Sequence, residues 1–263
     1  MNGPRKHLLW ITTPLLTAAL IGLWHVSIDL FDISRFILPR PADVAGGLAK
    51  MLSQGETYGH AMTTITEALA GFLLGSALGI LTGAVLGKLP LLEFTLRPFI
   101  IALQVVPKIA LIPLFILWFG FGPESKILMS AMLAFFPVFA NTLFGIKSVD
   151  PGHRDVMISL NASRWTTFTR LELPSSLPAI MTGMEVGMVF ATVGAVVGEF
   201  MGGSQGLGFV AVSSLNAGEV DILFADLILL TVVGFALYSM VLAFRRIAVP
   251  WHESVFINRQ NVA

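Results

Sequence analysis

The sequence contains no cysteine among its 263 residues, which excludes disulfide bonds and thiolate chemistry. Charged residues are also scarce: they form 12% of the chain, against about 25% in an ordinary soluble protein. The 16 Lys and Arg balance the 16 Asp and Glu, so no net charge favours nucleic acid as a partner. The five His include no pair at i, i+4 spacing, and we expect no metal site.

Hydrophobic residues are correspondingly abundant: they form 55% of the chain, whose mean hydropathy is +0.82. A helix needs roughly 20 apolar residues to cross the hydrocarbon core, because every backbone polar group must be bonded inside the segment. We therefore predict an all-α integral membrane protein, surrounded by membrane lipid and folded as a single domain. The six predicted transmembrane helices lie at about 8–28, 62–87, 97–120, 125–147, 176–201 and 222–245.

The first apolar stretch follows Arg5 and Lys6, as the core of a secretory signal peptide would. It is longer than the roughly 7–15 residues of such a core, and no A-x-A cleavage site follows it. We interpret it as a retained span.

Basic residues give the orientation. With a cytoplasmic amino terminus and alternating spans, the external basic residues are only Arg35, Arg40, Lys50 and Lys126. Lys108 falls inside the third span, and every other Lys and Arg falls on the cytoplasmic side, as the positive-inside rule requires. We predict a multi-pass protein of the cell inner membrane with both termini cytoplasmic. Residues 148–175 then form its longest cytoplasmic loop.

The second predicted span has a glycine pattern that indicates close helix packing, and the third has prolines that indicate a pathway lining. The second has a glycine at every fourth position, which predicts close approach to neighbouring helices, at Gly71, Gly75, Gly79, Gly83 and Gly87. The third holds Pro107 and Pro113, each of which removes a backbone donor and tends to kink a helix. A kinked span suits a pathway lining better than a lipid-facing position.

Motifs that are missing narrow the function. No G-x-x-x-x-G-K-S/T sequence occurs, so we expect no P-loop ATP site in this chain. Neither G-x-S-x-G nor H-E-x-x-H is present, which argues against an intramembrane enzyme, and we assign no catalytic residue. An ion-gradient-driven secondary transporter is the alternative: it accounts for the spans and their charges, but not for the cytoplasmic loop.

That loop carries the most informative motif. Val156, Leu160, Phe168 and Leu171 predict two short amphipathic helices, with Asn161 at their junction. Residues 155–157 (DVM), Asn161 and 171–174 (LELP) resemble the EAA loop of permeases from binding-protein-dependent ABC importers, which reads E-A-A, then G, then I-x-L-P. Asn tolerates a left-handed backbone better than other non-Gly residues, so a turn can survive there.

The similarity covers nearly the whole chain. Segments that look like the nitrate, sulfonate, taurine and thiamine-precursor branch are 37–41 (ILPRP), 107–114 (PKIALIPL), 117–120 (LWFG), 124–126 (ESK), 136–137 (FP), 141–142 (NT) and 197–200 (VGEF). The resemblance implies the type I importer permease fold. It also implies two permease copies, two ATP-binding cassette subunits that hold ATP and Mg, and an external substrate-binding protein.

In such a complex this chain binds no cofactor and hydrolyses no ATP itself. The substrate expected for this branch is a small organic anion or a heteroaromatic vitamin precursor. The resemblance further implies that the loop docks on the ATPase as a coupling helix, through Asp155, Ser159, Asn161, Ala162, Ser163 and Arg164.

Charged side chains within a membrane usually face a bundle interior or water, so they are candidates for a translocation pathway. Lys108 and Glu185 either form an ion pair between the third and fifth spans or contact the substrate. Glu199, near the external end, either caps a loop or touches the solute. Uncharged polar candidates for the same pathway are Gln104, Asn141 and Thr192.

Overall fold

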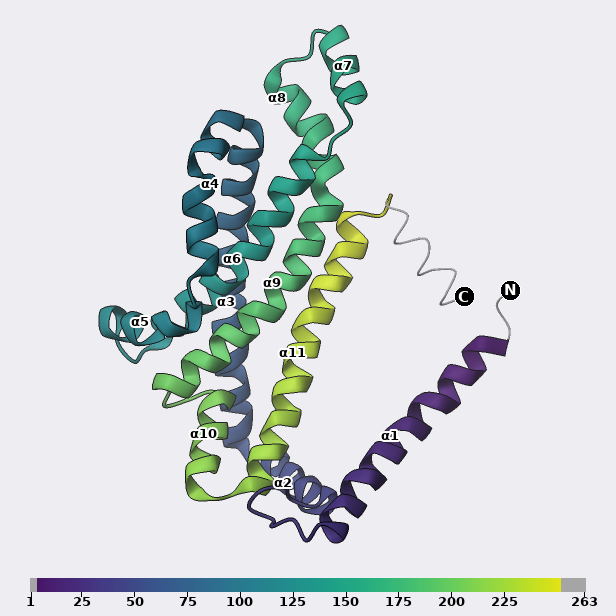
Figure 1. The fold of residues 1–263 in the computed structure, drawn as a ribbon, viewed down its shortest axis with the longest axis vertical. Coiled ribbons are helices and arrows are strands. Elements are labelled where there is room, and N and C mark those ends of the chain that lie inside the picture. The colour runs from purple at the N-terminus through teal and green to yellow at the C-terminus, as the bar shows by residue number, and fades with distance from the viewer. Residues whose placement is uncertain (1–3, 252–263) are drawn as a thin grey trace.

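The computed structural model describes residues 4–251, with side chains from Thr12 onward, and that part of the chain is helical (Figure 1). The all-α prediction is confirmed. The elements are α1 (Pro4–Leu30), α2 (Pro41–Ser53), α3 (Gly55–Lys88), α4 (Pro90–Val105), the 3-10 helix η1 (Lys108–Leu111), α5 (Ile112–Phe119), α6 (Pro123–Lys147), α7 (Pro151–Ser159), α8 (Arg164–Thr167), the π-helix η2 (Phe168–Glu172), α9 (Leu173–Gly202), α10 (Leu207–Ala217) and α11 (Val220–Ala248).

Within residues 4–251, five helical segments are long and apolar enough to cross a membrane, namely those of α1, α3, α6, α8 to α9, and α11. A sixth span results if α4 and the η1–α5 segment count together, although these two parts are bent by 83°. The stretch predicted at 97–120 is therefore not one straight helix, and its first part already begins at Pro90. Pro107 offers no N–H to continue the helix, and Val106 before it is extended (φ −57°, ψ 128°).

The predicted close packing of the second span is confirmed, because all five glycines of the series face α6. A Cβ on Gly75 would collide with the backbone oxygen of Ala131, and one on Gly79 would lie 2.9 Å from the backbone oxygen of Phe135. Helices α3 and α6 thus pack backbone to backbone, which side chains larger than hydrogen would prevent.

Helix α9 approaches α6 in the same way. Its glycines leave no room for a Cβ against α6, at Gly183, Gly187, Gly194 and Gly198. Beside this three-helix contact, Phe72 of α3, Met188 of α9 and Leu237 of α11 belong to one buried apolar cluster. The bundle core therefore consists of α3, α6 and α9, with α11 packed alongside.

The remaining elements define two ends of the bundle (Figure 1). Helices α7 and α8 project beyond the spans at one end, and α2 and α10 lie at the other. Helix α1 stands apart from the bundle, and its most extensive contact is with α2. The start of α1 and the end of α11 both point toward the end that carries α7.

We predict that Gly75→Ala lowers the melting temperature of the purified protein in detergent. The added methyl meets a backbone oxygen that cannot rotate away, and overpacking of this kind costs about 1–3 kcal/mol. The matched control is Gly22→Ala in α1, where nothing lies within 4 Å of the added Cβ. Equal melting temperatures for the two variants would contradict the packing described for α3.

Candidate docking segment and translocation pathway

The connection between α6 and α9 folds into two short helices, as the sequence predicts. Helix α7 follows Asp150, whose Oδ1 accepts a hydrogen bond from the backbone N–H of Gly152 at 2.7 Å, and Pro151 occupies its first turn. Helix α8 follows Ser163, whose Oγ accepts from the N–H of Thr166 at 3.1 Å. Local capping therefore fixes where each helix begins.

Asn161 joins the two helices with a left-handed backbone, at φ +51°. Its N–H donates to the oxygen of Ile158 at 2.9 Å, and the N–H of Ala162 donates to the oxygen of Met157 at 3.0 Å. These two bonds form a Schellman motif, which ends α7 and satisfies two of its last carbonyls. The turn expected at Asn161 is therefore confirmed.

All six residues predicted to dock lie on this projecting segment, and they are exposed except for Ala162, which is half-buried. Between them the segment also exposes large apolar side chains, Val156, Ile158, Leu160 and Trp165, by 57–72%. Sequence reasoning did not select Ile158 or Trp165 for docking. Their signal was available, since each is a large apolar residue in a segment predicted to lie outside the membrane.

Gln104 and Lys108 come together at the bend between α4 and η1. The Nζ of Lys108 donates to the backbone oxygen of Gln104 at 2.9 Å and lies 4.6 Å from the ring centroid of Phe136. It borders a cavity of about 350 Å³ between α3, α6 and the bend, lined mostly by apolar side chains such as Leu78 and Phe115. The bend thus places one cation at the edge of an apolar cavity.

Of the two possibilities for Lys108 and Glu185, the ion pair between them is wrong. Oε1 of Glu185 accepts from Nη1 of Arg245 at 2.9 Å, which links α9 to the last turn of α11. Sequence reasoning had used Arg245 only as evidence of orientation.

Asn141 and Thr192 are not among the residues that line the cavity beside Lys108. Asn141 Nδ2 donates to the oxygen of Pro137 at 2.9 Å, and Thr192 Oγ1 donates to the oxygen of Met188 at 3.0 Å. Each bond lies within a single helix, α6 for Asn141 and α9 for Thr192. Such bonds to the preceding turn are common for polar side chains in membrane helices.

Glu199 caps a loop, which was one of its two predicted roles. It is 1% exposed, and its Oε2 accepts from the N–H of Gly208 at 2.6 Å. Nearby, Nδ1 of His60 accepts from the N–H of Gly206 at 3.1 Å, and Thr64 Oγ1 accepts from the N–H of Leu207 at 2.9 Å. Side chains of α3 and α9 therefore satisfy the backbone donors at the start of α10.

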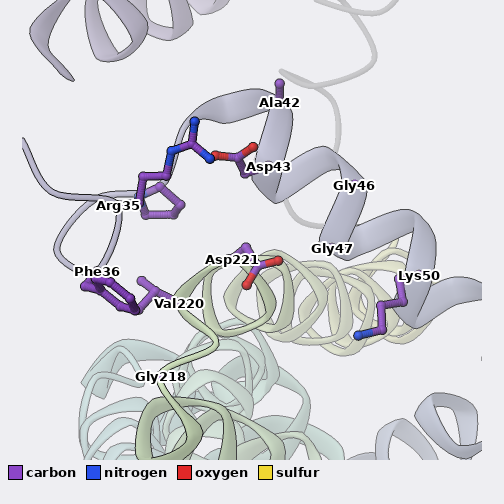
Figure 2. A pocket seen from close by; sticks show the side chains of 11 residues that line it. Arg35, Phe36, Ala42, Asp43, Gly46, Gly47, Lys50, Gly218, Val220 and Asp221 are labelled. Atoms are coloured by element: carbon purple, nitrogen blue, oxygen red, sulfur yellow. The ribbon is translucent and has the colours of Figure 1, made fainter. Parts of the chain in front are cut away.

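The end of the bundle opposite α7 carries an open pocket of about 490 Å³ (Figure 2). It lies between the α1–α2 connection, α2 and the turn before α11, and charged side chains of both signs border it, Arg35, Asp43, Lys50 and Asp221. Phe36 at its edge is 77% exposed.

The described part of the chain is an all-helical bundle of candidate membrane spans, with a capped two-helix segment projecting from one end. Residues 75–250 match the model of the family described as binding-protein-dependent transport system inner membrane component. The chain belongs to this family. It is thus the permease of an ABC importer in the inner membrane, works with an ATPase and a binding protein, and is not itself an ATPase.

Curated relatives agree over most of the chain. The aliphatic sulfonates transport permease SsuC of Bacillus subtilis, a putative assignment in its own name, is 36% identical over 95% of this chain and 91% of its own length. The riboflavin transport permease RibX of Chloroflexus aurantiacus is 34% identical over 92% of this chain and 90% of its own. The family inferred from the loop motif is confirmed, and it displaces the secondary-transporter alternative.

A solved structure of the MetNI methionine ABC transporter in inward-facing conformations contains a chain of similar fold. The TM-score is 0.59, and the match covers 75% of this chain and 96% of that one. Sequence identity is 16%, so the similarity concerns the fold alone.

We predict energetic coupling between Glu185 and Arg245. Glu185→Gln and Arg245→Gln should each lower the melting temperature in detergent, and the double variant should lose less than their sum, with a coupling energy of about 0.5–3 kcal/mol. The matched cycle combines Glu185→Gln with Lys108→Met, whose effects should add. Coupling in the Lys108 cycle and none in the Arg245 cycle would contradict the pairing.

Proposed function

We propose that the whole chain forms one transmembrane domain of an importer, coupled to a separate ATPase through residues 148–175. Two copies of the chain enclose the pathway, two ATP-binding cassette subunits bind ATP and Mg, and an external binding protein delivers the solute. Nucleotide-driven movement of the ATPases switches the spans between inward-open and outward-open states.

The observation that carries the proposal is the apolar surface of α7 and α8. Large apolar side chains that stay uncovered outside a membrane span favour a protein partner. The caps at Asp150, Asn161 and Ser163 hold this surface in a fixed shape, so a partner binds it without first ordering the segment. Asp155, Ser159 and Arg164 supply polar contacts around it, and Ala162 lies among them as a small, half-buried residue.

The distribution of charge supports cytoplasmic termini. Lys88 ends α3, Lys147 ends α6, and Arg245 lies in the last turn of α11, all at the end that carries α7. Basic residues concentrate on the cytoplasmic side of membrane proteins. The opposite end, with the open pocket beside Arg35 and Asp221, then faces the external binding protein (Figure 2).

The cavity beside Lys108 supports an organic substrate. A single cation at the edge of an apolar cavity suits a solute that combines an anionic group with an apolar or aromatic body. The relatives carry aliphatic sulfonates and riboflavin in their names, which fit that description in part. We propose a small organic anion or a heteroaromatic vitamin precursor, with Gln104 and Lys108 as contacts.

Substitution of Asn161 tests the docking proposal. We predict that Asn161→Val abolishes co-purification of the ATPase, because a β-branched residue is poorly tolerated at φ +51° and the Schellman turn is lost. The matched control is Asn161→Gly, which accepts the same backbone conformation and should retain the ATPase.

Both variants are compared for yield and melting temperature, since a lost complex must not reflect an unfolded permease. Retention of the ATPase by both variants, or loss from both, would contradict a docking role that depends on the turn.

A further inference from the structure

Three charged side chains meet at the base of the docking segment. Glu172, the last residue of η2, is 2% exposed. Its Oε2 accepts from Nζ of Lys88, at the end of α3, at 2.5 Å, and its Oε1 accepts from Nε of Arg154, in α7, at 3.2 Å. One buried carboxylate therefore joins η2 to α7, which is 18 residues away, and to the end of α3, which is 84 residues away.

Arg154 extends this connection to a fourth element. Its Nη2 donates to the backbone oxygen of Ile146 at 2.8 Å, in the last turn of α6. The guanidinium of Arg154 thus links α7 to the cytoplasmic end of α6 and, through Glu172, to the cytoplasmic end of α9. Because Glu172 also binds Lys88, the same connection reaches α3. These are the three helices that form the closely packed core of the bundle.

Other contacts between α7 and the spans are sparse. Among the described residues, α7 has no extensive packing against another element. A cavity of about 520 Å³, bordered by His153, Ala179 and Arg245, separates it from α9 and α11. Movement of α7 therefore reaches the spans through the backbone on either side and through Arg154.

On this geometry, which rests on the proposed docking function, we propose that Glu172 is the positioning residue of force transmission. It makes α7 and the ends of α3, α6 and α9 move as one body when the ATPase moves α7. Glu172 is buried, so a movement that separates it from Lys88 and Arg154 would leave an uncompensated charge out of water, which is costly. The residue acts through Lys88 and Arg154, and contacts neither ATPase nor solute.

The experiment uses the complete complex of permease, ATPase and binding protein in proteoliposomes. It measures uptake of a labelled aliphatic sulfonate, the solute in the name of one relative, per ATP hydrolysed. Glu172→Gln keeps the size of the side chain and removes its charge. We expect the ATPase to stay bound and to hydrolyse ATP, while solute uptake per ATP falls roughly tenfold, within the usual range of coupling between sites.

The matched control is Glu93→Gln. Glu93 pairs with Lys147 at 2.7 Å at the same end of the bundle, but joins α4 to α6 and does not touch the docking segment. It should keep the wild-type ratio. Lys88→Gln should behave like Glu172→Gln, and Lys88→Arg, which keeps the charge, should restore most of the ratio.

A wild-type ratio for Glu172→Gln, or an equal fall for Glu172→Gln and Glu93→Gln, overturns the transmission role. If Glu172→Gln does not assemble, the same ratio measured on Lys88→Gln and Lys88→Arg decides, since both keep the carboxylate. Failure of the wild-type permease to bind its ATPase would instead overturn the proposed function and leave a different signature.

Discussion

The close approach of α3, α6 and α9 is the constraint on which the rest of the structure depends. Glycines on α3 and α9 place backbone against backbone along α6, so these helices have little freedom to shift separately. A rigid core of this kind is what a transport cycle of two discrete states needs, because a small displacement at one end is carried to the other instead of being absorbed by loose packing. The cavity beside Lys108, the segment of α7 and α8, and the start of α10 all contact these three helices.

Charge at the end of the bundle that carries α7 has two roles. Lys88, Lys147, Arg154 and Arg245 fit the orientation of the chain, and each also forms an ion pair with a carboxylate that links separate elements. The same cations that keep this end out of the membrane thereby hold it together. At the opposite end side chains of α3 and α9 instead bond the backbone that starts α10.

Features with a local cause could be predicted from the sequence: apolar runs of sufficient length, the glycine series, and the left-handed turn at Asn161. Contacts between residues that are distant in the sequence could not be predicted. Arg245, which pairs with Glu185, is 60 residues away from it, and Lys88, one of the two partners of Glu172, is 84 residues away; neither pairing has a periodic signal. The prolines of the third stretch predicted a kink, but its angle of 83° depends on how η1 and α5 pack against α6.

The proposed contact of α7 and α8 with the ATPase is directly measurable, because the chain contains no cysteine. A single cysteine placed by Ile158→Cys is labelled with a photoactivatable cross-linker in the assembled complex, beside Phe36→Cys at the opposite end of the bundle. Both positions are well exposed, at 69% and 77%. If α7 and α8 dock on the ATPase, a covalent adduct with the ATPase forms from position 158 and none forms from position 36. An adduct from position 36, with none from position 158, would contradict it.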